Sequence, residues 1–348
     1  MKKIYAESMF IDSGAHSLYN IHVLKHYKRE GKHGRVLERP PVRWGGTDPS
    51  TDFSYFDLTR GSEFREYCDD YAEFMKEMRD KGVLLANIDA IGNPALTWEI
   101  QRFFEEEHGV QPMPIVHCHT PMSWVDKYLE AGKYDLLGVG GLGQGISRHE
   151  YFGWADKFFL HLCPKSEGYL PVIKTHGFAM TSWELICRWP WWSVDSATWV
   201  KLSAYGWLYI PRRKGGEFSF NRPPMTVNFS KRPPKKKRKL VAKAMDHPSW
   251  TDNPAPRETE TAKHYQNIGK GAREAVDAWL AHIEIPMGSV DENGEMEEFG
   301  IVSHHRARSI ANLIYLKELE ASRPEWPHPL DHRVVEATGV RLRKGLGL

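Results

Sequence analysis

The sequence predicts an α/β fold, namely a (β/α)8 TIM-like barrel with insertions and a C-terminal helical extension. Between residues 83 and 195, short apolar segments of strand length alternate with segments of helical periodicity, and the connections are brief. Such alternation is typical of parallel strands joined by helices. The repetition over a chain of 348 residues favours a closed barrel over an open sheet.

The spacing of apolar residues predicts where the individual helices and strands lie. Phe64, Tyr71 and Met78 belong to a set of apolar residues at helical spacing, which predicts a helix over 63–78 with one buried face. Further helices are expected over 95–108, 123–131, 147–162, 181–188, 262–283 and 303–320. Strands are expected over 4–11, 83–88, 114–116, 136–139, 171–175 and 193–195.

Past residue 195 the pattern changes. Residues 207–210 and 217–220, joined by a turn at 214–216, predict a β-hairpin, and 225–229 a third strand. The proline-containing end from residue 324 is expected to pack loosely. We expect a catalytic barrel core over 1–210, a β-hairpin and basic nucleic-acid-contacting segment over 211–245, and C-terminal helices over 246–348 that complete or pack on the barrel.

The composition is that of a globular protein, with 41% hydrophobic residues and 13 Trp. No apolar run reaches the roughly 18 residues needed to span a bilayer, so neither a membrane anchor nor a signal peptide is expected. The four cysteines are far apart and form no Cys-x-x-Cys pair, which argues against a cysteine-rich zinc site and for a reduced compartment. We therefore expect a cytoplasmic protein.

A basic strip interrupts an otherwise acidic chain. Residues 231–243 hold eight basic residues and no acidic one, whereas the whole chain carries a net charge of only +2. Its centre matches a nuclear import signal, but contact with a phosphate backbone is the preferred interpretation, with a solvated loop as the alternative. The nucleic-acid-binding candidates are Lys235, Lys236, Lys237, Arg238 and Lys239.

The candidate strands end in polar or glycine-rich clusters. These clusters contain Asp12, Asp89, His117 with His119, Gly140 with Gly141, His176 and Asp195. In a parallel barrel all such strand ends lie on one face, where active sites form. Asp195 taken alone would also suit the N-cap of the next helix. The recurrence along the chain favours an active site.

Carboxylates in such a set suit one kind of chemistry. Two of them can break a glycosidic bond by double displacement, one attacking the anomeric carbon and the other moving the proton. A third carboxylate can accept the N–H donors of a purine edge, and the backbone N–H groups of a Gly-Gly turn can bind its carbonyl. Asp195, Asp12, Asp89 and Gly140-Gly141 would supply these groups.

The ordered motifs resemble those of the tRNA-guanine transglycosylase superfamily. They are Asp12-Ser13-Gly14-Ala15, the strand-end Asp89, Gly140-Gly141-Leu142 and Ser193-Val194-Asp195-Ser196, and the resemblance extends over roughly residues 4 to 210. It is nearest to the phage and bacterial deoxypurine-in-DNA protein A branch, which places 7-deazaguanines into DNA. The tRNA enzymes carry a cysteine-rich zinc motif after the nucleophile, and no cysteine follows Cys187 here, which favours the DNA-directed branch.

The resemblance implies a role for each matching position. Asp195 would be the nucleophile that forms a covalent glycosyl-enzyme at C1′ of the target guanosine, and Asp12 the general acid/base. The groups that hold the base would be Ser13, Asp89 and the backbone of Gly141-Leu142, joined by Gly140 and His176 at the same face. His16 stands where the tRNA enzymes stack an aromatic residue on the base, and His117 where they read it with a glutamine. No cofactor and no metal is expected.

Three alternatives stay open. The substrate is tRNA instead of DNA; the chain is a barrel metallohydrolase that uses His117, His119, His176 and Asp195 as ligands; or it is a nucleic-acid-binding module without catalysis. The last leaves three strand-end aspartates unexplained. The sequence also leaves open whether two chains pair as a homodimer and which 7-deazaguanine is used.

Overall fold

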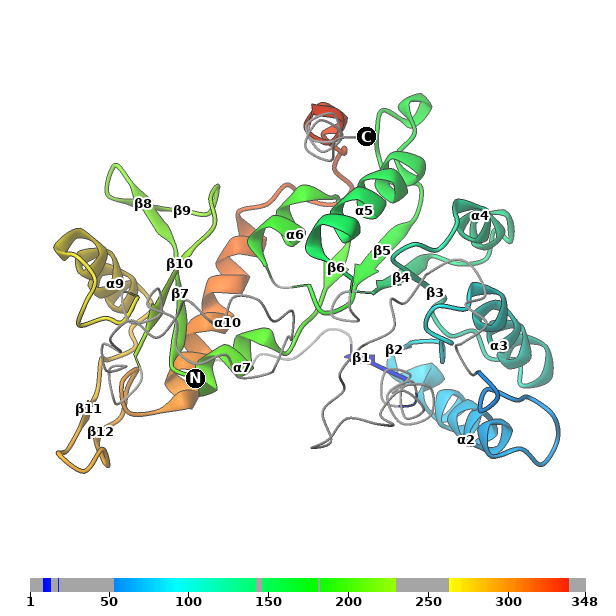
Figure 1. The fold of residues 1–348 in the computed structure, drawn as a ribbon, viewed down its shortest axis with the longest axis horizontal. Helices are drawn as coiled ribbons and strands as arrows, with labels where there is room; N and C mark the ends of the chain where they lie inside the picture. Colours follow the sequence, from blue (N-terminus) through cyan, green and yellow to red (C-terminus); the bar gives the residue numbers. More distant parts are fainter. Residues whose placement is uncertain are drawn as a thin grey trace, which may run out of the picture. The chain divides into compact units, whose positions relative to one another are not determined.

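A computed structural model gives the structure of residues 9–13, 18, 53–141, 146–180, 182–229 and 263–337. The chain folds into two compact units (Figure 1). The first unit takes in the described residues of Met1–Met180, Arg188–Asp195 and Trp326–Leu348, and the second those of Thr181–Cys187 and Ser196–Glu325. The domain boundaries expected after residues 210 and 245 stay predictions.

Parallel strands in chain order form the centre of the first unit. They are β1 (Met9–Ile11), β2 (Val83–Leu85), β3 (Ile115–His117), β4 (Leu136–Gly140), β5 (Lys174–Gly177) and β6 (Ser193–Val194). β1 pairs with β2, and β3 to β6 form a four-stranded sheet. A parallel bridge between Ala86 and Met113 joins the two sets. The carboxyl ends of these strands therefore lie along one edge.

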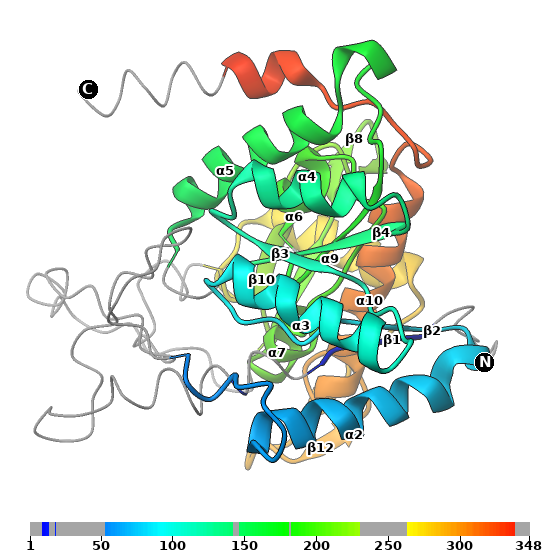
Figure 2. The same ribbon diagram turned by 90° about the vertical axis from the view of Figure 1, so that its right-hand side faces the viewer.

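Helices cover the outer side of these strands, as the side view shows (Figure 2). They are α2 (Glu63–Met78), α3 (Pro94–Glu107), α4 (Met122–Glu130) and α5 (Arg148–Leu162). Each follows from local sequence: Ser147 and Glu150, for example, form a capping box at the start of α5. Asn93 accepts from the N–H of Leu96, and Pro94 occupies the first turn of α3.

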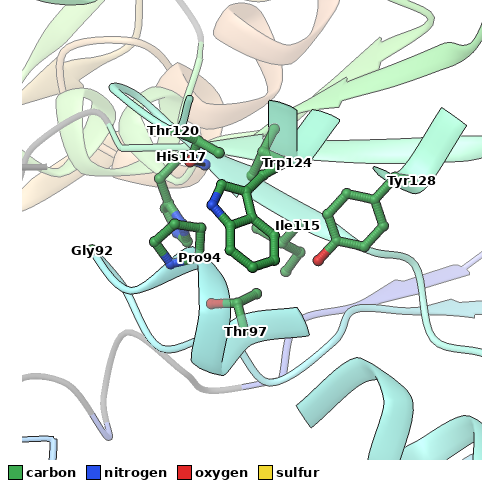
Figure 3. Close-up of a pocket in the computed structure, with 9 residues that line it drawn as sticks. Gly92, Pro94, Thr97, Ile115, His117, Thr120, Trp124 and Tyr128 are labelled. Atoms are coloured by element: carbon green, nitrogen blue, oxygen red, sulfur yellow. Dashed lines mark hydrogen bonds between the residues drawn. The ribbon is translucent and has the colours of Figure 1, made fainter. Parts of the chain in front are cut away.

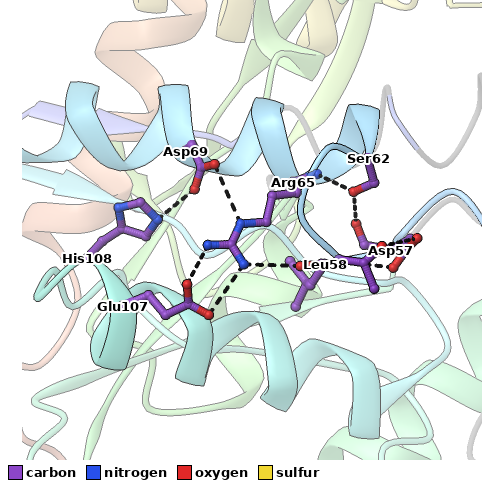
Figure 4. Close-up of polar contacts among 8 residues, drawn as sticks. Asp57, Leu58, Ser62, Arg65, Asp69, Glu107 and His108 are labelled. Carbon is purple, nitrogen blue, oxygen red and sulfur yellow. Dashed lines mark hydrogen bonds and ion pairs between the residues drawn. The ribbon is translucent and has the colours of Figure 1, made fainter.

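A polar clamp joins α2 to α3 (Figure 4). The guanidinium of Arg65 on α2 donates to both carboxylate oxygens of Glu107 at the end of α3 and lies over the ring of Phe103, 4.5 Å from its centroid. Asp69 accepts from His108 at 2.8 Å. Beneath this clamp the apolar faces of both helices pack into one buried cluster that includes Phe64 and Phe104, as the helical spacing predicts.

The second unit is built on antiparallel strand pairs and helices among its described residues. The strands are β7 (Trp207–Ile210), which pairs with β10 (Met225–Asn228), and β8 (Arg212–Lys214), which pairs with β9 (Glu217–Ser219). A small ribbon joins β11 (Ser289–Val290) to β12 (Met296–Glu298). The helices are α7 (Thr198–Ala204), α9 (Lys270–His282) and α10 (His305–Ala321). The short helix α6 (Trp183–Arg188) begins in this unit.

Buried polar side chains of α10 hold the second unit together. The side-chain oxygen of Asn312 accepts from the N–H of Tyr209, and its amide donates to the carbonyl of Trp207 and to the hydroxyl of Ser203. Arg308 donates to the carbonyls of Ser203 and Ile301. Because these groups satisfy backbone atoms of α7 and β7, the three elements are locked in register.

Two sequence expectations are wrong in detail. Residues 207–210 do not pair with 217–220: the turn at 214–216 joins β8 to β9, and β7 pairs with β10 instead. The end of the chain packs loosely only in part as far as residue 337: most of these residues are exposed, but three side chains are held. Leu330 and Val335 are buried, and the ring of His332 stacks on Tyr169 at 3.9 Å between centroids. Burial of apolar side chains here outweighs the breaks that the prolines introduce.

The fold is thus α/β, as expected, and contains a four-stranded parallel sheet, while closure into a TIM-like barrel stays a prediction. Within the described residues, no helix is long and apolar enough to cross a membrane.

Candidate functional site

Most of the residues singled out in the sequence lie at the carboxyl edge of the first unit's strands. Asp12 and Ser13 directly follow β1, and Asp195 directly follows β6. His117 and Gly140 end β3 and β4 and lie side by side in the register. Asp89 and Gly141 come shortly after β2 and β4, and His176 lies on β5 opposite Ser193.

Asp195 is an exposed carboxylate of this edge, with 46% of its side chain accessible. One carboxylate oxygen, Oδ1, accepts from the N–H of Ala179 at 2.8 Å. The Asp195 backbone is tied down on both sides, donating to the carbonyl of Gly177 and accepting from the N–H of Met180. The loop after β5 therefore wraps the Asp195 backbone and holds one carboxylate oxygen while the side chain stays half-exposed.

The wrapping depends on an unusual backbone conformation. Ala179 has a φ of 60°, in the left-handed region that non-glycine residues seldom adopt. This conformation turns its N–H toward Asp195. At Gly177, a Cβ atom would lie 2.7 Å from the sulfur of Met180, so only glycine lets the loop fold back this closely.

His176 stands behind the carboxylate of Asp195. Its Nδ1 lies 2.8 Å from the hydroxyl oxygen of Ser193, and its Nε2 lies 3.9 Å from Oδ1 of Asp195. The His176 side chain is 6% exposed, and the ring of Phe178 meets it edge-on. Burial lowers the pKa of His176 below its ordinary value of 6.5, and the charge of Asp195 opposes that shift only in part. The imidazole is therefore neutral at pH 7.

Asp89 and His117 form a second, buried pair. Nε2 of His117 lies 2.8 Å from Oδ2 of Asp89, and their side chains are only 9% and 7% exposed. The N–H of His117 donates to the hydroxyl of Thr120. Because its side chain is buried beside an imidazole, the Asp89 carboxylate is poorly placed to attack a substrate.

The glycines of β4 make room for His117. A Cβ atom on Gly140 would lie 2.9 Å from Cδ2 of the His117 ring. Gly141 has a φ of 110°, and a Cβ there would meet Cys118 at 2.8 Å. The carbonyl of Gly140 already accepts from the N–H of Cys118. The Gly-Gly turn thus lets the end of β3 lie flat against the end of β4.

Asp12 and Ser13 occupy the start of the same edge. Ser13 is buried and its carbonyl accepts from the hydroxyl of Tyr67 on α2, whereas Asp12 is exposed. Burial raises the pKa of Tyr67, and the negative charge of Asp12 raises it further.

Three strand spacings separate β3 from β6, roughly 14 Å measured along a flat sheet. The two carboxylate–histidine pairs therefore stand at opposite ends of the four-stranded sheet.

Some expected site residues lie outside the described residues. They are His16, Leu142, Lys235, Lys236, Lys237, Arg238 and Lys239.

A small pocket opens beside His117, between α3 and α4 (Figure 3). Tyr128 from α4 lines it, and its buried hydroxyl has no hydrogen-bond partner among the described residues. The other lining residues are Gly92, Pro94, Thr97, Ile115, Val116, His117, Thr120 and Trp124. The pocket thus offers a hydroxyl and an imidazole next to the Asp89–His117 pair.

Sequence reasoning missed the pocket residue Tyr128 and the N–H of Ala179. Tyr128 carries only the helical spacing of a core residue, and a backbone donor leaves no mark on the residue type. Among the described residues no three His, Cys, Asp or Glu side chains gather as a metal site would require. The set His117, His119, His176 and Asp195 therefore gains no support as a ligand cluster.

Comparison with protein-family models, with curated proteins and with solved structures finds no match to this chain. Function is therefore inferred from the geometry of the strand-end edge.

Proposed function

We propose that this chain is a base-exchange transglycosylase that replaces guanine in DNA with a 7-deazaguanine, such as the 7-cyano form. The observation that carries the proposal is the setting of Asp195. Its carboxylate is half-exposed at the end of a parallel strand, its Oδ1 is held by the N–H of Ala179, and a neutral His176 stands behind it. A carboxylate nucleophile needs this combination of access and fixed direction.

The contrast with Asp89 supports Asp195 as the nucleophile. Asp89 is 7% exposed and lies 2.8 Å from His117, whereas Asp195 is 46% exposed and 3.9 Å from its histidine. A distance of 3.9 Å is too long for a hydrogen bond. His176 therefore does not engage the lone pairs of the Asp195 carboxylate, which must attack the substrate. Asp89 instead suits the N–H donors of a purine edge.

The proposed reaction is a double displacement. Asp195 attacks C1′ of the target nucleotide, an ester bond forms there, and the glycosidic bond to guanine breaks with its electron pair. Protonated Asp12 supplies the proton that guanine takes up on leaving. The Asp12 carboxylate then removes the N9 proton of the incoming 7-deazaguanine, whose nitrogen attacks C1′ and releases Asp195.

The base would lie between the nucleophile and the buried pair. Ser13, Asp89, His117 and the Gly140-Gly141 turn belong to the same strand-end edge, which is why we assign the base to them. Leu142 and His16 keep the roles that the family resemblance implies.

Ser193, His176 and Asp195 are arranged like the serine, histidine and aspartate of a hydrolase triad. The exposure of Asp195, however, differs from that of a triad aspartate. In a serine hydrolase the aspartate is buried behind the histidine and the serine is the reacting group. Here the aspartate is the exposed end, and Ser193 lies on β6 within the sheet, opposite His176. The arrangement therefore favours Asp195 as the group that reacts.

The test is incorporation of labelled 7-cyano-7-deazaguanine into duplex DNA and into tRNA, side by side, with the full chain. Label in DNA, lost in Asp195→Ala, is the expected result. Trapping of a covalent DNA adduct in the unmodified protein and not in the variant would identify the intermediate. Label in tRNA alone would assign the chain to the tRNA-directed branch, and label in neither would overturn the proposal.

A matched control comes from Asp126 on α4. This aspartate is 40% exposed and pairs with His161 on a helix surface. Asp126→Ala removes the same functional group from the same unit and is expected to leave incorporation unchanged. Equal losses in both variants would show that Asp195→Ala acts through folding.

A further inference from the structure

The hairpin of β8 and β9 in the second unit carries a cluster of exposed basic residues. Arg212, Arg213 and Lys214 are consecutive and all exposed, and Arg222 is exposed just past β9. Glu217 is the one acidic residue between positions 212 and 222. The hairpin continues from β7 and returns into β10, so it stands out beyond that strand pair (Figure 1).

The hairpin is a stiff element. Gly215 and Gly216 have φ values of 61° and 91°, which is the conformation of a tight two-residue hairpin turn. In the middle of β9, the ring of Phe218 packs edge-on against Trp279 of α9, 5.2 Å between centroids, and lies 5.1 Å from the ring of His282. These contacts anchor the hairpin to the core of its own unit.

The two arginines are held by backbone carbonyls. Arg212 donates from Nε to the carbonyl of Pro223, and Arg213 donates from Nε and Nη2 to the carbonyl of Gly216. The ion pairs found among the described residues of the chain include neither arginine. Their positive charges are therefore oriented without being neutralised, as phosphate recognition requires.

The strand register assigns the charges to two faces. Arg213 is opposite Phe218 and shares its face, whereas Arg212 is opposite Ser219 and Lys214 is opposite Glu217 on the other face. Arg212, Lys214 and the Ser219 hydroxyl thus share one side of a two-stranded ribbon with the carboxylate of Glu217, and this side carries two positive charges and one negative.

We propose that the β8–β9 hairpin docks into the major groove of duplex DNA, with Arg212 and Lys214 contacting backbone phosphates. The major groove of B-form DNA admits a two-stranded ribbon, whereas that of an A-form RNA helix is too narrow and deep. The choice of DNA rests on the proposed function. Binding, however, is measurable without base exchange, so the two proposals fail separately.

The experiment compares Arg212→Gln/Lys214→Gln with the unmodified chain, using fluorescence anisotropy of a labelled DNA duplex over a series of salt concentrations. Each lost phosphate contact lowers the slope of log K against log salt by about 0.9, so two contacts lower it by about 1.8. The control Arg306→Gln/Lys317→Gln removes the same charge from exposed positions of α10 and is expected to keep the slope.

Two further comparisons, a charge-conserving variant and a duplex RNA, complete the experiment. The swap Arg212→Lys/Lys214→Arg keeps the charge and is expected to keep the slope. An unchanged slope in the Gln variant, or an equal fall in the α10 control, would overturn the proposal. Equal binding of a duplex RNA with the same change of slope would overturn the choice of DNA. A changed slope in a protein without base exchange would leave the hairpin proposal standing and remove the proposed function.

Discussion

Nε2 of His176 lies 3.9 Å from Oδ1 of Asp195, while Nδ1 of the same ring lies 2.8 Å from the hydroxyl of Ser193. The histidine is thus fixed at one nitrogen and faces the carboxylate with the other. Its pKa is lowered by burial, so it faces Asp195 as an uncharged ring at neutral pH. The proposed activity depends on that neutrality, because an imidazolium would form an ion pair with the attacking group.

The pH dependence of base exchange is the first prediction. As the pH falls through the lowered pKa of His176, a positive charge appears beside Asp195. Opposite unit charges about 4 Å apart attract by about 1 kcal/mol in water and about 4 kcal/mol near a protein surface. Exchange should therefore fall on the acid side of pH 6.5. His176→Gln should lose this part of the profile while keeping exchange at pH 7.5; an identical acid limb in the variant would contradict the role of His176.

The pH dependence of the free energy of unfolding should also reflect the titration of His176. His176 has an ordinary pKa of 6.5 in the unfolded chain and a lower one when folded, so between these values the unfolded state binds more protons. Its stabilising contribution is complete above pH 6.5 and is lost as the pH falls through the folded pKa. The loss of Tm between pH 7.5 and 5 should be smaller in His176→Gln than in the unmodified protein. Parallel Tm curves would count against this.

Ala179 offers a test of the loop that wraps Asp195. Ala179→Pro removes the N–H that donates to Oδ1 and cannot adopt a φ of 60°. A lost hydrogen bond to a charged group is worth about 1.5–3 kcal/mol, so exchange should fall by about 10- to 100-fold. Ala179→Gly keeps the N–H and suits the left-handed conformation, and it should retain exchange. Similar rates for the Pro variant and the unmodified protein would exclude the positioning role.

The buried pair predicts a loss of stability. His117→Ala leaves the Asp89 carboxylate buried without its partner at 2.8 Å, which should cost about 3–5 kcal/mol in the free energy of unfolding. His117→Gln retains a donor and should lose less. Urea denaturation gives the three values. If the Ala variant is as stable as the unmodified protein, the imidazole contact does not stabilise the fold.

Two glycines give a matched pair of alanine substitutions. Gly140→Ala places a Cβ 2.9 Å from the buried His117 ring and should destabilise the protein by about 1–3 kcal/mol. Gly153, on α5, has no atom within 4 Å of its Cβ position, so Gly153→Ala should stabilise by about 0.5–1 kcal/mol. Thermal unfolding of both variants, compared with the unmodified protein, measures these changes in stability. A harmless Gly140→Ala would mean that the end of β3 shifts freely.

Local patterns predict the helices well because helical periodicity is a property of consecutive residues. The helix expected over 63–78 is α2, Glu63–Met78, and Phe64 and Tyr71 of its expected apolar face are buried, whereas Met78 is only partly buried. The strand expected over 171–175 begins instead at Lys174. The N–H of Val172 donates to the carbonyl of Leu162 and so leaves the ladder. Tertiary packing determines which carbonyl accepts from a given N–H group, and a local sequence pattern does not contain that information.

For the site, the sequence by itself determined which side chains end the strands, because a strand followed by Asp, His or Gly is visible in the chain. Only the tertiary structure decided which of them are buried and which are exposed. Asp89 and Asp195 are the same residue type after the same kind of strand, yet one is buried against His117 and the other is half-exposed under the N–H of Ala179. Burial and hydrogen bonding come from residues distant in the chain, and these contacts set access and charge.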